Sequence, residues 1–289
     1  MDEGRLRALG ASGVKVSPLG VGTNRWRKGV NDGAVFEAYQ ALQDGGVSFL
    51  DTAEIYGFGQ SERLVGETIR RDGRPATVAS KFAPVVGRAS PKGLLAALDA
   101  SLARLVRLDL YYIHFPFPFA DLDALADAMA EAVRAGRVRA VGVSNFSAEQ
   151  MRRFAGRLGR TGVPLAANQV NYSLVNRKPE SNGVLDACRE LDVALVAYFP
   201  LASGRLAGAT TAKDGQGEVL QGALTAAAQA HGAAISEVAL NWLLARDARI
   251  IPIPGVTKAR NAKANLKALD WTLTEAEFAA IDAASASFR

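Results

Sequence analysis

Four ionisable side chains stand where short apolar runs of the sequence end. Asp51 follows the run at 47–50, and Tyr56 comes five residues later, just before glycines at 57 and 59. Lys81 closes the run in VASKF, and His114 closes the run in LYYIHF. These runs have the length and composition of β-strands. An acid at the carboxyl end of a strand, followed by a phenol in the next loop, is typical of where α/β barrels place their chemistry.

Together these side chains predict proton transfer by a phenol. A free tyrosine has a pKa of ~10, which is too high for ready proton exchange near neutrality. A nearby ammonium stabilises the phenolate and lowers that pKa, while a carboxylate holds the ammonium in place. A histidine at the same site orients a substrate carbonyl or shares its proton. Such a phenol suits the reduction of a carbonyl to an alcohol, with the hydride supplied by a cofactor.

Each residue also has a purely structural interpretation. Asp51 could cap a helix, Tyr56 could be an ordinary loop residue, Lys81 could lie on a rim, and His114 could be a satisfied core histidine. The set is harder to explain in this way, because a lysine and an aspartate that end apolar strands must pair or function.

The elements that must position these residues repeat at a regular interval. Strand-like runs begin near residues 19, 47, 76, 109, 138, 167, 194 and 249, and all but the last spacing are close to the ~30 residues of a βα unit. Helical patterns fill the gaps, at 91–105, 122–135, 147–158, 183–191, 218–231, 236–245 and 274–284.

Eight such units predict an α/β fold of the (β/α)8 TIM barrel class, with an N-terminal β-hairpin and additional helices. We expect residues 1–289 to form one domain. An open doubly wound sheet is the alternative fold. It requires a glycine fingerprint directly after a strand, and no GxGxxG occurs in the sequence.

Composition narrows the class of protein further. The formal charge of +5 comes from scattered residues, which favours an anionic small ligand over a nucleic acid. The single cysteine, Cys188, excludes an internal disulfide and fits a reducing compartment. No secretory signal or membrane-length apolar run is visible. We therefore expect a cytoplasmic monomer or weak oligomer without a metal site or a nucleic-acid or membrane partner.

Eight motifs in order make the chain resemble the aldo-keto reductase family over nearly its whole length. They are GVGTN at 20–24, DTAEIYGFGQSE at 51–62, SKF at 80–82, IHF at 113–115, VGVSNFS at 141–147, NQVNYS at 168–173, YFPLASGRLAG at 198–208 and IPIPGVTKARNAKANL at 251–266. The resemblance implies a cofactor that lies across the barrel mouth and a catalytic tetrad. In that tetrad Tyr56 is the general acid, Lys81 lowers the pKa of Tyr56, Asp51 pairs with Lys81, and His114 orients the carbonyl.

The resemblance also implies NADPH as the cofactor, with NADH as the alternative. Ser144, Asn145 and Gln169 match positions that hold the nicotinamide carboxamide, and Tyr198 matches the aromatic residue that stacks on its ring. The loop at 201–206 matches the pyrophosphate-binding loop, and the segment at 255–258 opens a helix whose N-terminus can bind an anion. The expected cofactor-binding residues are Gly22, Thr23, Asp51, Ser144, Asn145, Gln169, Tyr198, Leu201, Ser203, Gly204, Arg205, Leu206, Gly255, Thr257, Lys258, Asn261 and Asn265.

Two departures from the family pattern affect the expected ligands. Asn261 stands where many members have an arginine that clamps the adenosine 2′-phosphate. Lys258 and Arg260 could supply the missing charge, although a lysine is not a bidentate clamp. His114 is followed by the unusual run Phe-Pro-Phe-Pro-Phe at 115–119, in which Phe117 and Phe119 are equally well explained by core packing. The side chains expected to form an apolar substrate wall are Trp26, Phe58, Phe82, Phe115 and Phe146.

Two other functions compete with a carbonyl reductase. One is a sensor or partner protein that binds the cofactor on the same barrel, with little turnover. The other is a lyase that uses Lys81 as a Schiff base, but a nucleophilic lysine would require desolvation rather than a carboxylate partner.

Overall fold

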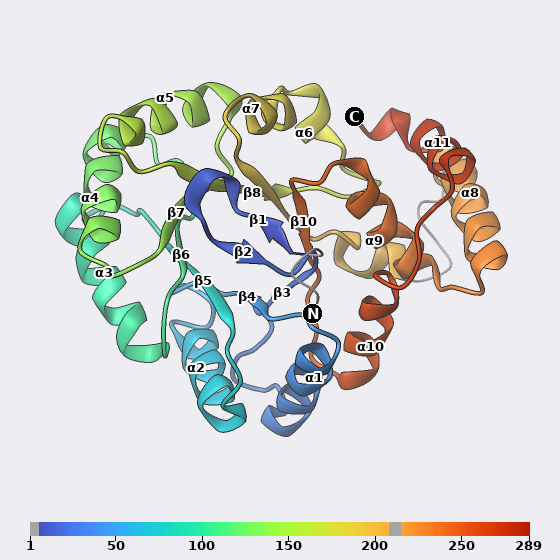
Figure 1. The fold of residues 1–289 in the computed structure, drawn as a ribbon, viewed down its shortest axis with the longest axis horizontal. Coiled ribbons are helices and arrows are strands. Elements are labelled where there is room, and N and C mark those ends of the chain that lie inside the picture. Colours follow the sequence, from blue (N-terminus) through green and yellow to red (C-terminus); the bar gives the residue numbers. More distant parts are fainter. Residues whose placement is uncertain (1–5, 208–214) are drawn as a thin grey trace.

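The protein is described by a computed structural model at residues 6–207 and 215–289. Eight parallel strands form one sheet in which each strand lies beside its neighbour in sequence, and Figure 1 shows them as a ring enclosed by helices. The strands are β3 (Gly20–Gly22), β4 (Phe49–Asp51), β5 (Thr77–Phe82), β6 (Leu110–Ile113), β7 (Ala140–Ser144), β8 (Leu165–Asn171), β9 (Ala194–Tyr198) and β10 (Ile250–Ile253). The predicted (β/α)8 barrel is confirmed, and the open doubly wound sheet is wrong.

The last and first strands of the ring meet at two glycines. Gly22 pairs with Gly255 in a parallel bridge, and its backbone N–H donates to the carbonyl of Pro254 at 3.2 Å. A β-carbon at Gly22 would lie 3.1 Å from the carbonyl oxygen of Ile253, so a side chain would crowd this junction. The closure brings the carboxyl ends of all eight strands to one mouth.

The helices form the outer layer, and several begin with the caps that their sequences provide. Ser90 accepts from the N–H of Gly93, and Ser147 with Gln150 forms a capping box. The helices are α1 (Asp32–Asp44), α2 (Gln60–Asp72), α3 (Pro91–Arg104), α4 (Leu122–Arg134), α5 (Ala148–Gly159), α6 (Lys178–Ser181), α7 (Val184–Glu190), α8 (Gly215–His231), α9 (Ile235–Arg246), α10 (Ala259–Lys267) and α11 (Glu275–Ala284), with short 3-10 turns at Gly10–Ser12, Ala202–Ala207 and Ala286–Phe288.

The predicted N-terminal hairpin closes the opposite end of the barrel from the mouth. Its strands are β1 (Arg7–Ala8) and β2 (Lys15–Val16), which pair antiparallel and cross the centre of the ring in Figure 1. Leu9, Val14 and Val16 are buried in the same core cluster as the residues that fill the barrel interior. The hairpin therefore seals the floor with apolar side chains and leaves the mouth as the accessible end.

Membrane insertion has no candidate segment in the described structure. Of the helices within residues 6–207 and 215–289, none combines the length and the apolar character that a membrane crossing requires.

Candidate active site

A buried ion pair lies at the mouth, at the ends of β4 and β5. Lys81 Nζ is 2.5 Å from Asp51 Oδ1, and it also donates to the backbone carbonyl of Thr52 at 2.7 Å. Asp51 pairs in register with Ala79, so Lys81, two residues further along its strand, extends from the same side of the sheet. The second carboxylate oxygen, Asp51 Oδ2, accepts from Gln169 Nε2 at 2.7 Å. The pair is therefore held by groups at the end of β4, on β5 and, across the barrel, on β8.

Burial and pairing shift the pKa values of Asp51 and Lys81 in opposite directions. Neither side chain has appreciable contact with solvent. Burial raises the pKa of Asp51 above its usual value, and Lys81 and Gln169 only partly offset that effect. Burial alone would lower the pKa of Lys81, but Asp51 and Tyr56 hold it above its usual value. Lys81 thus keeps its proton at neutral pH despite complete burial.

Tyr56 lies over this pair. Lys81 Nζ is 5.1 Å from the centroid of the Tyr56 ring and interacts with its phenol. Lys81 acts to lower the pKa of Tyr56, as expected, but this effect does not prevail over burial. Burial raises the pKa of Tyr56, and the ammonium offsets only part of that increase. The phenol therefore holds its proton at neutral pH, which is the form that a proton donor needs.

His114 follows β6 and contacts Tyr56 at the mouth. The two rings are 5.8 Å apart, edge to face, and the backbone N–H of His114 donates to the carbonyl of Phe82 at 2.8 Å. Burial, together with the charge of Lys81, lowers the pKa of His114 to about 3. The imidazole is therefore neutral, and its buried Nδ1 has no hydrogen-bond partner among the described residues. The structure thus brings Asp51, Tyr56, Lys81 and His114 together, as the sequence predicts.

Three hydroxyl groups beneath the Tyr56 loop fix its position, and the sequence analysis assigned no such role. Ser61 Oγ donates to the carbonyl of Thr23 at 2.9 Å, and it lies 2.8 Å from the hydroxyls of both Thr23 and Thr52. Thr23 Oγ1 also donates to the carbonyl of Asp51 at 2.9 Å. Because these residues belong to the ends of β3 and β4 and the start of α2, the cluster ties the loop to the strands on which it depends. Thr23, expected to line the cofactor site, is fully buried in this cluster.

Glu54 is a second support for the loop that the sequence analysis missed. Its carboxylate accepts from the N–H of Ala83 at 2.7 Å and from Arg88 at 2.9 Å. The bonds join the Tyr56 loop to the segment that follows Lys81, so both sides of the proton-transfer site are linked. The only signal in the sequence was a carboxylate two residues before the phenol.

The side chains expected at the nicotinamide ring form a connected row along the mouth. Tyr198 donates its hydroxyl to Asn145 Oδ1 at 2.9 Å, and Asn145 Nδ2 donates to Ser144 Oγ and to the carbonyl of His114, both at 3.1 Å. Ser144 in turn donates to the backbone carbonyl of Gln169 at 2.9 Å. This row anchors the hydroxyl end of Tyr198, and it joins the ends of β6, β7, β8 and β9.

Gln169 is the amide in this row whose chemistry matches a carboxamide. Its amide nitrogen donates to Asp51 Oδ2 at 2.7 Å, and none of the described residues donates a hydrogen bond to its amide oxygen. An amide with a fixed donor end and an available acceptor end suits the amide nitrogen of nicotinamide. The donor set present at the mouth therefore fits the nicotinamide cofactor that the motifs imply.

The expected phosphate-binding segments have the exposure that an anion site requires. In the loop after β9, Ser203 and Gly204 are exposed with positive φ angles, and Arg205 is exposed, whereas Leu206 is buried as an apolar anchor. Gly208, at the end of the corresponding motif, lies outside the described residues. After β10, helix α10 begins without a side-chain cap, and Lys258, Arg260 and Asn261 are exposed at its start.

The remaining expected cofactor residues differ in accessibility. Gly255 is exposed and Thr257 is partly exposed, whereas Asn265 is almost completely buried within α10. Leu201 is partly buried against the core.

The expected apolar substrate wall is mostly wrong. Trp26, Phe82 and Phe146 have essentially no exposed surface, so they pack in the core and cannot line a pocket. Trp26 is held there by donation from its indole N–H to the carbonyl of Val256 at 2.6 Å. Phe58, in contrast, is 93% exposed and has a positive φ angle, so it projects from the loop tip.

Phe115 remains in place beside the catalytic residues, with its ring 5.8 Å from that of His114. Phe117 and Phe119 contact each other edge to face, and Phe119 is 86% exposed, so core packing does not explain it. Ile55, which the sequence analysis overlooked, is 45% exposed directly before Tyr56. The apolar surface near the phenol therefore comes from loop residues rather than from strand ends.

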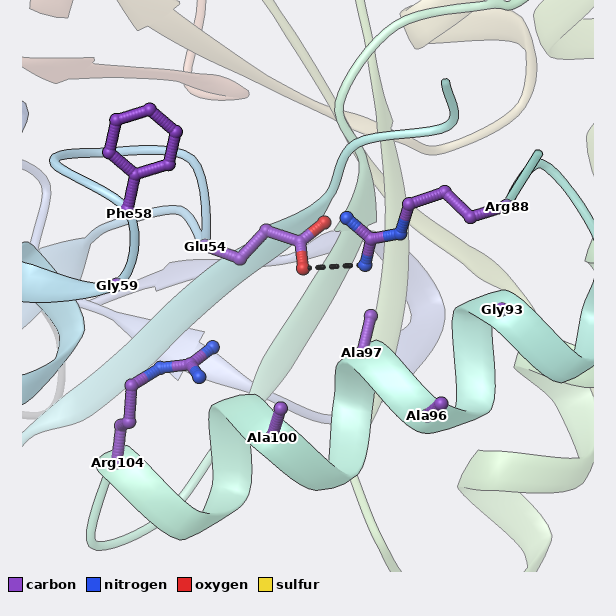
Figure 2. Close-up of a pocket in the computed structure, with 9 residues that line it drawn as sticks. All are labelled: Glu54, Phe58, Gly59, Arg88, Gly93, Ala96, Ala97, Ala100 and Arg104. Carbon is purple, nitrogen blue, oxygen red and sulfur yellow. Dashed lines mark hydrogen bonds and ion pairs between the residues drawn. The ribbon is translucent and has the colours of Figure 1, made fainter. Parts of the chain in front are cut away.

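A cavity of about 380 Å³ lies outside the mouth, on the far side of the Tyr56 loop. Figure 2 shows Glu54 and Arg88 paired on one side, with the small side chains of Ala96, Ala97 and Ala100 on α3 opposite. None of the four tetrad residues lines it. Its charged residues already have partners within the protein, so we assign it no catalytic role.

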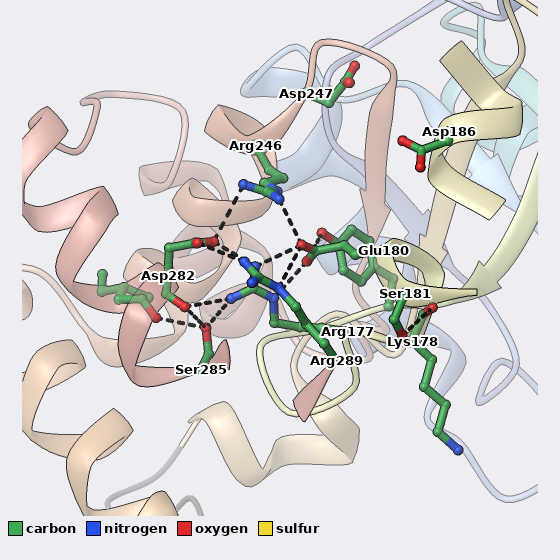
Figure 3. Close-up of polar contacts among 12 residues, drawn as sticks. Arg177, Lys178, Glu180, Ser181, Asp186, Arg246, Asp247, Asp282, Ser285 and Arg289 are labelled. Atoms are coloured by element: carbon green, nitrogen blue, oxygen red, sulfur yellow. Dashed lines mark hydrogen bonds and ion pairs between the residues drawn. The ribbon is translucent and has the colours of Figure 1, made fainter. Parts of the chain in front are cut away.

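A second buried group of charges lies in the outer layer, between α6, α9 and α11. Arg177 donates to Glu180 at 2.7 and 2.8 Å and to Asp282 Oδ1 at 2.6 Å, and Arg246 and Arg289 also contact these two carboxylates (Figure 3). The backbone N–H of Arg177 also donates to the carbonyl of Phe288 at 2.7 Å. We call these residues the Arg177 cluster; it fastens the last helix to the segment after β8.

A metal centre finds no support in the described parts of the chain, where no set of three or more histidine, cysteine, aspartate and glutamate side chains is arranged to hold an ion.

Comparison with known proteins gives consistent matches over most of the chain. The sequence description of the aldo/keto reductase family matches residues 18–286. The chain is 36% identical over 281 residues to a 6-dehydroglucose reductase from Novosphingobium aromaticivorans, covering 91% of this chain and 90% of the relative. It is 32% identical over 278 residues to an aldo-keto reductase from Schizosaccharomyces pombe whose name specifies NADP(+), covering 83% of this chain and 80% of that protein.

A solved structure shares the same fold. A thermostable aldo-keto reductase, crystallised with the inhibitor epalrestat, superposes with a TM-score of 0.83 at 32% identity. The superposition covers 96% of this chain and 99% of the other.

Proposed function

Because this chain belongs to the aldo/keto reductase family and is an NAD(P)H-dependent oxidoreductase, we propose that it reduces an aldehyde or ketone to an alcohol with NADPH as hydride donor and Tyr56 as general acid. The observation that carries the proposal is the Tyr56 ring 5.1 Å from Lys81 Nζ, over the buried Lys81–Asp51 pair. Burial raises the pKa of Tyr56, which supports a phenol that keeps its proton until it is donated.

The reaction divides between the cofactor and the side chains. A nicotinamide cofactor held at the mouth would supply the hydride for the carbonyl carbon. Tyr56 donates its proton to the carbonyl oxygen, so the alcohol forms with both hydrogens accounted for. Lys81 stabilises the phenolate that remains, and Asp51 keeps the ammonium in position. His114 orients the carbonyl beside the phenol. Its imidazole does so in the neutral form, because burial and the charge of Lys81 lower its pKa.

The preference for NADPH rests on the start of α10. Lys258 and Arg260 are exposed there beside an uncapped helix N-terminus, and both features favour binding of the adenosine 2′-phosphate. They would supply the positive charge that Asn261 lacks. The yeast relative named for NADP(+) supports the same choice. On the nicotinamide side we propose Gln169, Asn145, Ser144 and Tyr198, with Ser203, Gly204 and Arg205 near the pyrophosphate.

The direct test is loss of absorbance at the reduced-nicotinamide band. NADPH and NADH are compared in parallel against aldehydes, ketones, α-dicarbonyls and pyridoxal. We expect turnover with at least one carbonyl class and higher kcat/KM with NADPH. Replacement of Lys258 and Arg260 by alanine should raise the KM for NADPH and leave that for NADH nearly unchanged. Binding of cofactor without turnover of any carbonyl would instead favour a sensing protein.

A further inference from the structure

A buried carboxylate lies at the far end of the Tyr56 loop. Glu62 is in the first turn of α2, and its side chain has no exposed surface. Its Oε1 accepts from Ser80 Oγ at 2.5 Å, and its Oε2 accepts from Arg104 Nε at 2.6 Å. The two oxygens therefore reach two different elements, since Ser80 belongs to β5 and Arg104 is the last residue of α3.

Ser80 links this carboxylate to the strand that carries Lys81. It comes directly before Lys81 on β5, so the two side chains point to opposite faces of the sheet. Lys81 meets Asp51 at the mouth, whereas Ser80 is fully buried and meets Glu62 on the helix side. A hydroxyl that donates to a carboxylate at this distance makes a short, charge-assisted hydrogen bond. The start of α2 is thus firmly joined to β5.

Arg104 lies against the turn that ends the loop. A β-carbon at Gly59 would lie 2.9 Å from Arg104 Nε and 3.1 Å from its Cδ, so the arginine occupies the space that a side chain at 59 would take. Gly59 has a φ angle of 80° and stands immediately before α2. Arg104 therefore contacts the turn and binds Glu62 at the same time.

Two carboxylates stand on either side of Tyr56, and their partners stand on either side of Lys81. Glu54 accepts from the N–H of Ala83 at 2.7 Å, two residues after Lys81. Glu62 accepts from the hydroxyl of the residue directly before Lys81. Both ends of the Tyr56 loop are therefore bonded to the segment that holds the ammonium.

A cavity separates the loop from α3 over part of its length. It has a volume of about 380 Å³, and Figure 2 shows the loop on one side and the helix on the other. The α3 residues that line it are Gly93, Ala96, Ala97, Ala100 and Arg104. Four of these five carry no side-chain atom beyond a β-carbon, so space remains behind the loop. The loop has room to move away from Lys81 once its bonds to β5 are lost.

We propose that Glu62 and Arg104 are positioning residues of the reaction, which hold the Tyr56 loop against β5 so that the phenol stays over the Lys81 ammonium. Both act through the loop and not on the reacting atoms. The inference deepens the proposed function and rests on it, since it concerns the geometry of the same proton transfer.

Glu62→Ala removes both bonds of the carboxylate. We expect the single-turnover rate of carbonyl reduction, measured with NADPH prebound, to fall about 10-fold to 100-fold, because a displacement of about 1 Å costs a rate factor of that order. The Kd for NADPH should stay near that of the wild type, since Glu62 bonds to Ser80 and Arg104 rather than to the expected cofactor ligands. A wild-type rate in this variant would overturn the inference.

Arg104→Met tests the same link from the surface, in case the loss of a buried carboxylate prevents folding. The Arg104 side chain is partly exposed, and methionine keeps its aliphatic stem. We expect a rate about 3-fold to 10-fold below the wild type, a smaller loss than in Glu62→Ala because Ser80 still holds the carboxylate. An unchanged rate would remove Arg104 from the proposal.

Glu62→Gln separates the bridging contacts from the charge. Glutamine has the same reach, and its amide can accept from Arg104 and donate to Ser80 Oγ at once. Its rate should therefore lie within about threefold of the wild type, since both contacts are kept. A loss as deep as that of Glu62→Ala would contradict a positioning role that works through these contacts.

Asp109→Ala is the matched structural control. Asp109 is as buried as Glu62, binds Arg107 and Arg139, and accepts from the N–H of Val78 at 2.9 Å. It stands directly before β6, at the floor end of the barrel. We expect its melting temperature to fall as it does for Glu62→Ala, with an unchanged rate. Equal losses of rate in the two variants would mean that the barrel is loosened as a whole, which would overturn the inference.

The same measurements distinguish failure of the inference from failure of the proposed function. A folded wild type that binds NADPH and reduces no carbonyl would overturn the proposed function and this inference with it. A wild type that reduces a carbonyl at the same rate as Glu62→Ala and Arg104→Met would overturn this inference alone.

Discussion

The Lys81–Asp51 pair and the Arg177 cluster are both buried groups of charges, but they are satisfied to different degrees. Arg177 directs its guanidinium at Glu180, Asp282 and Ser285, and it lies 4.8 Å above the ring of Trp242. Lys81 has one carboxylate, one backbone carbonyl and, above it, a phenol with which it interacts. Arg177 is thus surrounded by several acceptors within the protein, whereas Lys81 has a single carboxylate and lies beside the Tyr56 phenol.

The pKa values of the carboxylates in the two groups are shifted in opposite directions. Burial would raise the pKa of Glu180, but hydrogen bonds from Arg177 and Tyr172 and the charge of Arg246 hold it below its usual value. At Asp51 the effect of burial prevails, and the pKa is raised. Several cations therefore fix a structural carboxylate firmly in its charged form, while a single lysine leaves the carboxylate of the mouth less stabilised.

Removing Lys81 should have the largest effect of any change in this comparison. Lys81→Met deprives Tyr56 of its cation and leaves Asp51 buried with only Gln169 as its partner. We expect kcat/KM to fall by about 10³ or more and the free energy of unfolding to fall by about 3–5 kcal/mol. Steady-state kinetics and denaturant unfolding measure the two effects separately.

The double variant Asp51→Asn with Lys81→Met removes both charges and serves as the control. Stability should largely recover, because no unpaired charge remains buried, while activity should not. Recovery of activity together with stability would show that the pair is only structural.

Removing Arg177 should affect stability alone. Arg177→Met leaves Glu180 and Asp282 without their most buried cation, so we expect a loss of about 3–5 kcal/mol in the free energy of unfolding. Because the cluster lies in the outer layer between helices, kcat per folded molecule should remain within about twofold of the wild type. A kcat that falls as steeply as for Lys81→Met, at a temperature where both variants are folded, would show that the Arg177 cluster is not purely structural.

The effect confined to acid pH is a pH dependence of stability from His114. Its pKa in the folded protein is about 3, below the ordinary value of ~6.5, so the unfolded chain binds the proton more readily. The stability contributed by the neutral imidazole is present above pH ~6.5 and is lost as pH falls from there toward 3.

Replacing His114 with glutamine should reduce this acid sensitivity. The slope of unfolding free energy against pH between 6.5 and 3 should become shallower, by at most about 1.4 kcal/mol per pH unit. A slope identical to that of the wild type would mean that His114 titrates normally in the folded protein.

The positions of the tetrad could be predicted from the sequence because parallel strands end at one edge, and each tetrad residue stands at or just after such an end. The barrel followed from the regular spacing of apolar runs. The direction of individual side chains and their degree of burial could not be predicted from the sequence. Phe82 follows Lys81 directly and so faces the helices, and the pKa of Tyr56 depends on how deeply the loop settles into the mouth, which no motif encodes.

Within the Arg177 cluster only the pair Arg177 and Glu180 is local in the sequence, and nothing local indicates the other members. Arg177 and Asp282 are 105 positions apart in the chain, so only the packing of the last helix brings them together. Likewise, the hydroxyl cluster around Ser61 forms only because the start of α2 packs against the ends of β3 and β4. Contacts of this kind are set by tertiary packing and become visible only with the structure.

The most direct test of the central claim is the rate of carbonyl reduction by Tyr56→Phe, measured in a single turnover with NADPH prebound. This change removes the phenolic proton and keeps the ring over Lys81. We predict a rate lower by about 10²–10⁴ with the Kd for NADPH within twofold of the wild type. A rate within threefold of the wild type would contradict the assignment of Tyr56 as the proton donor.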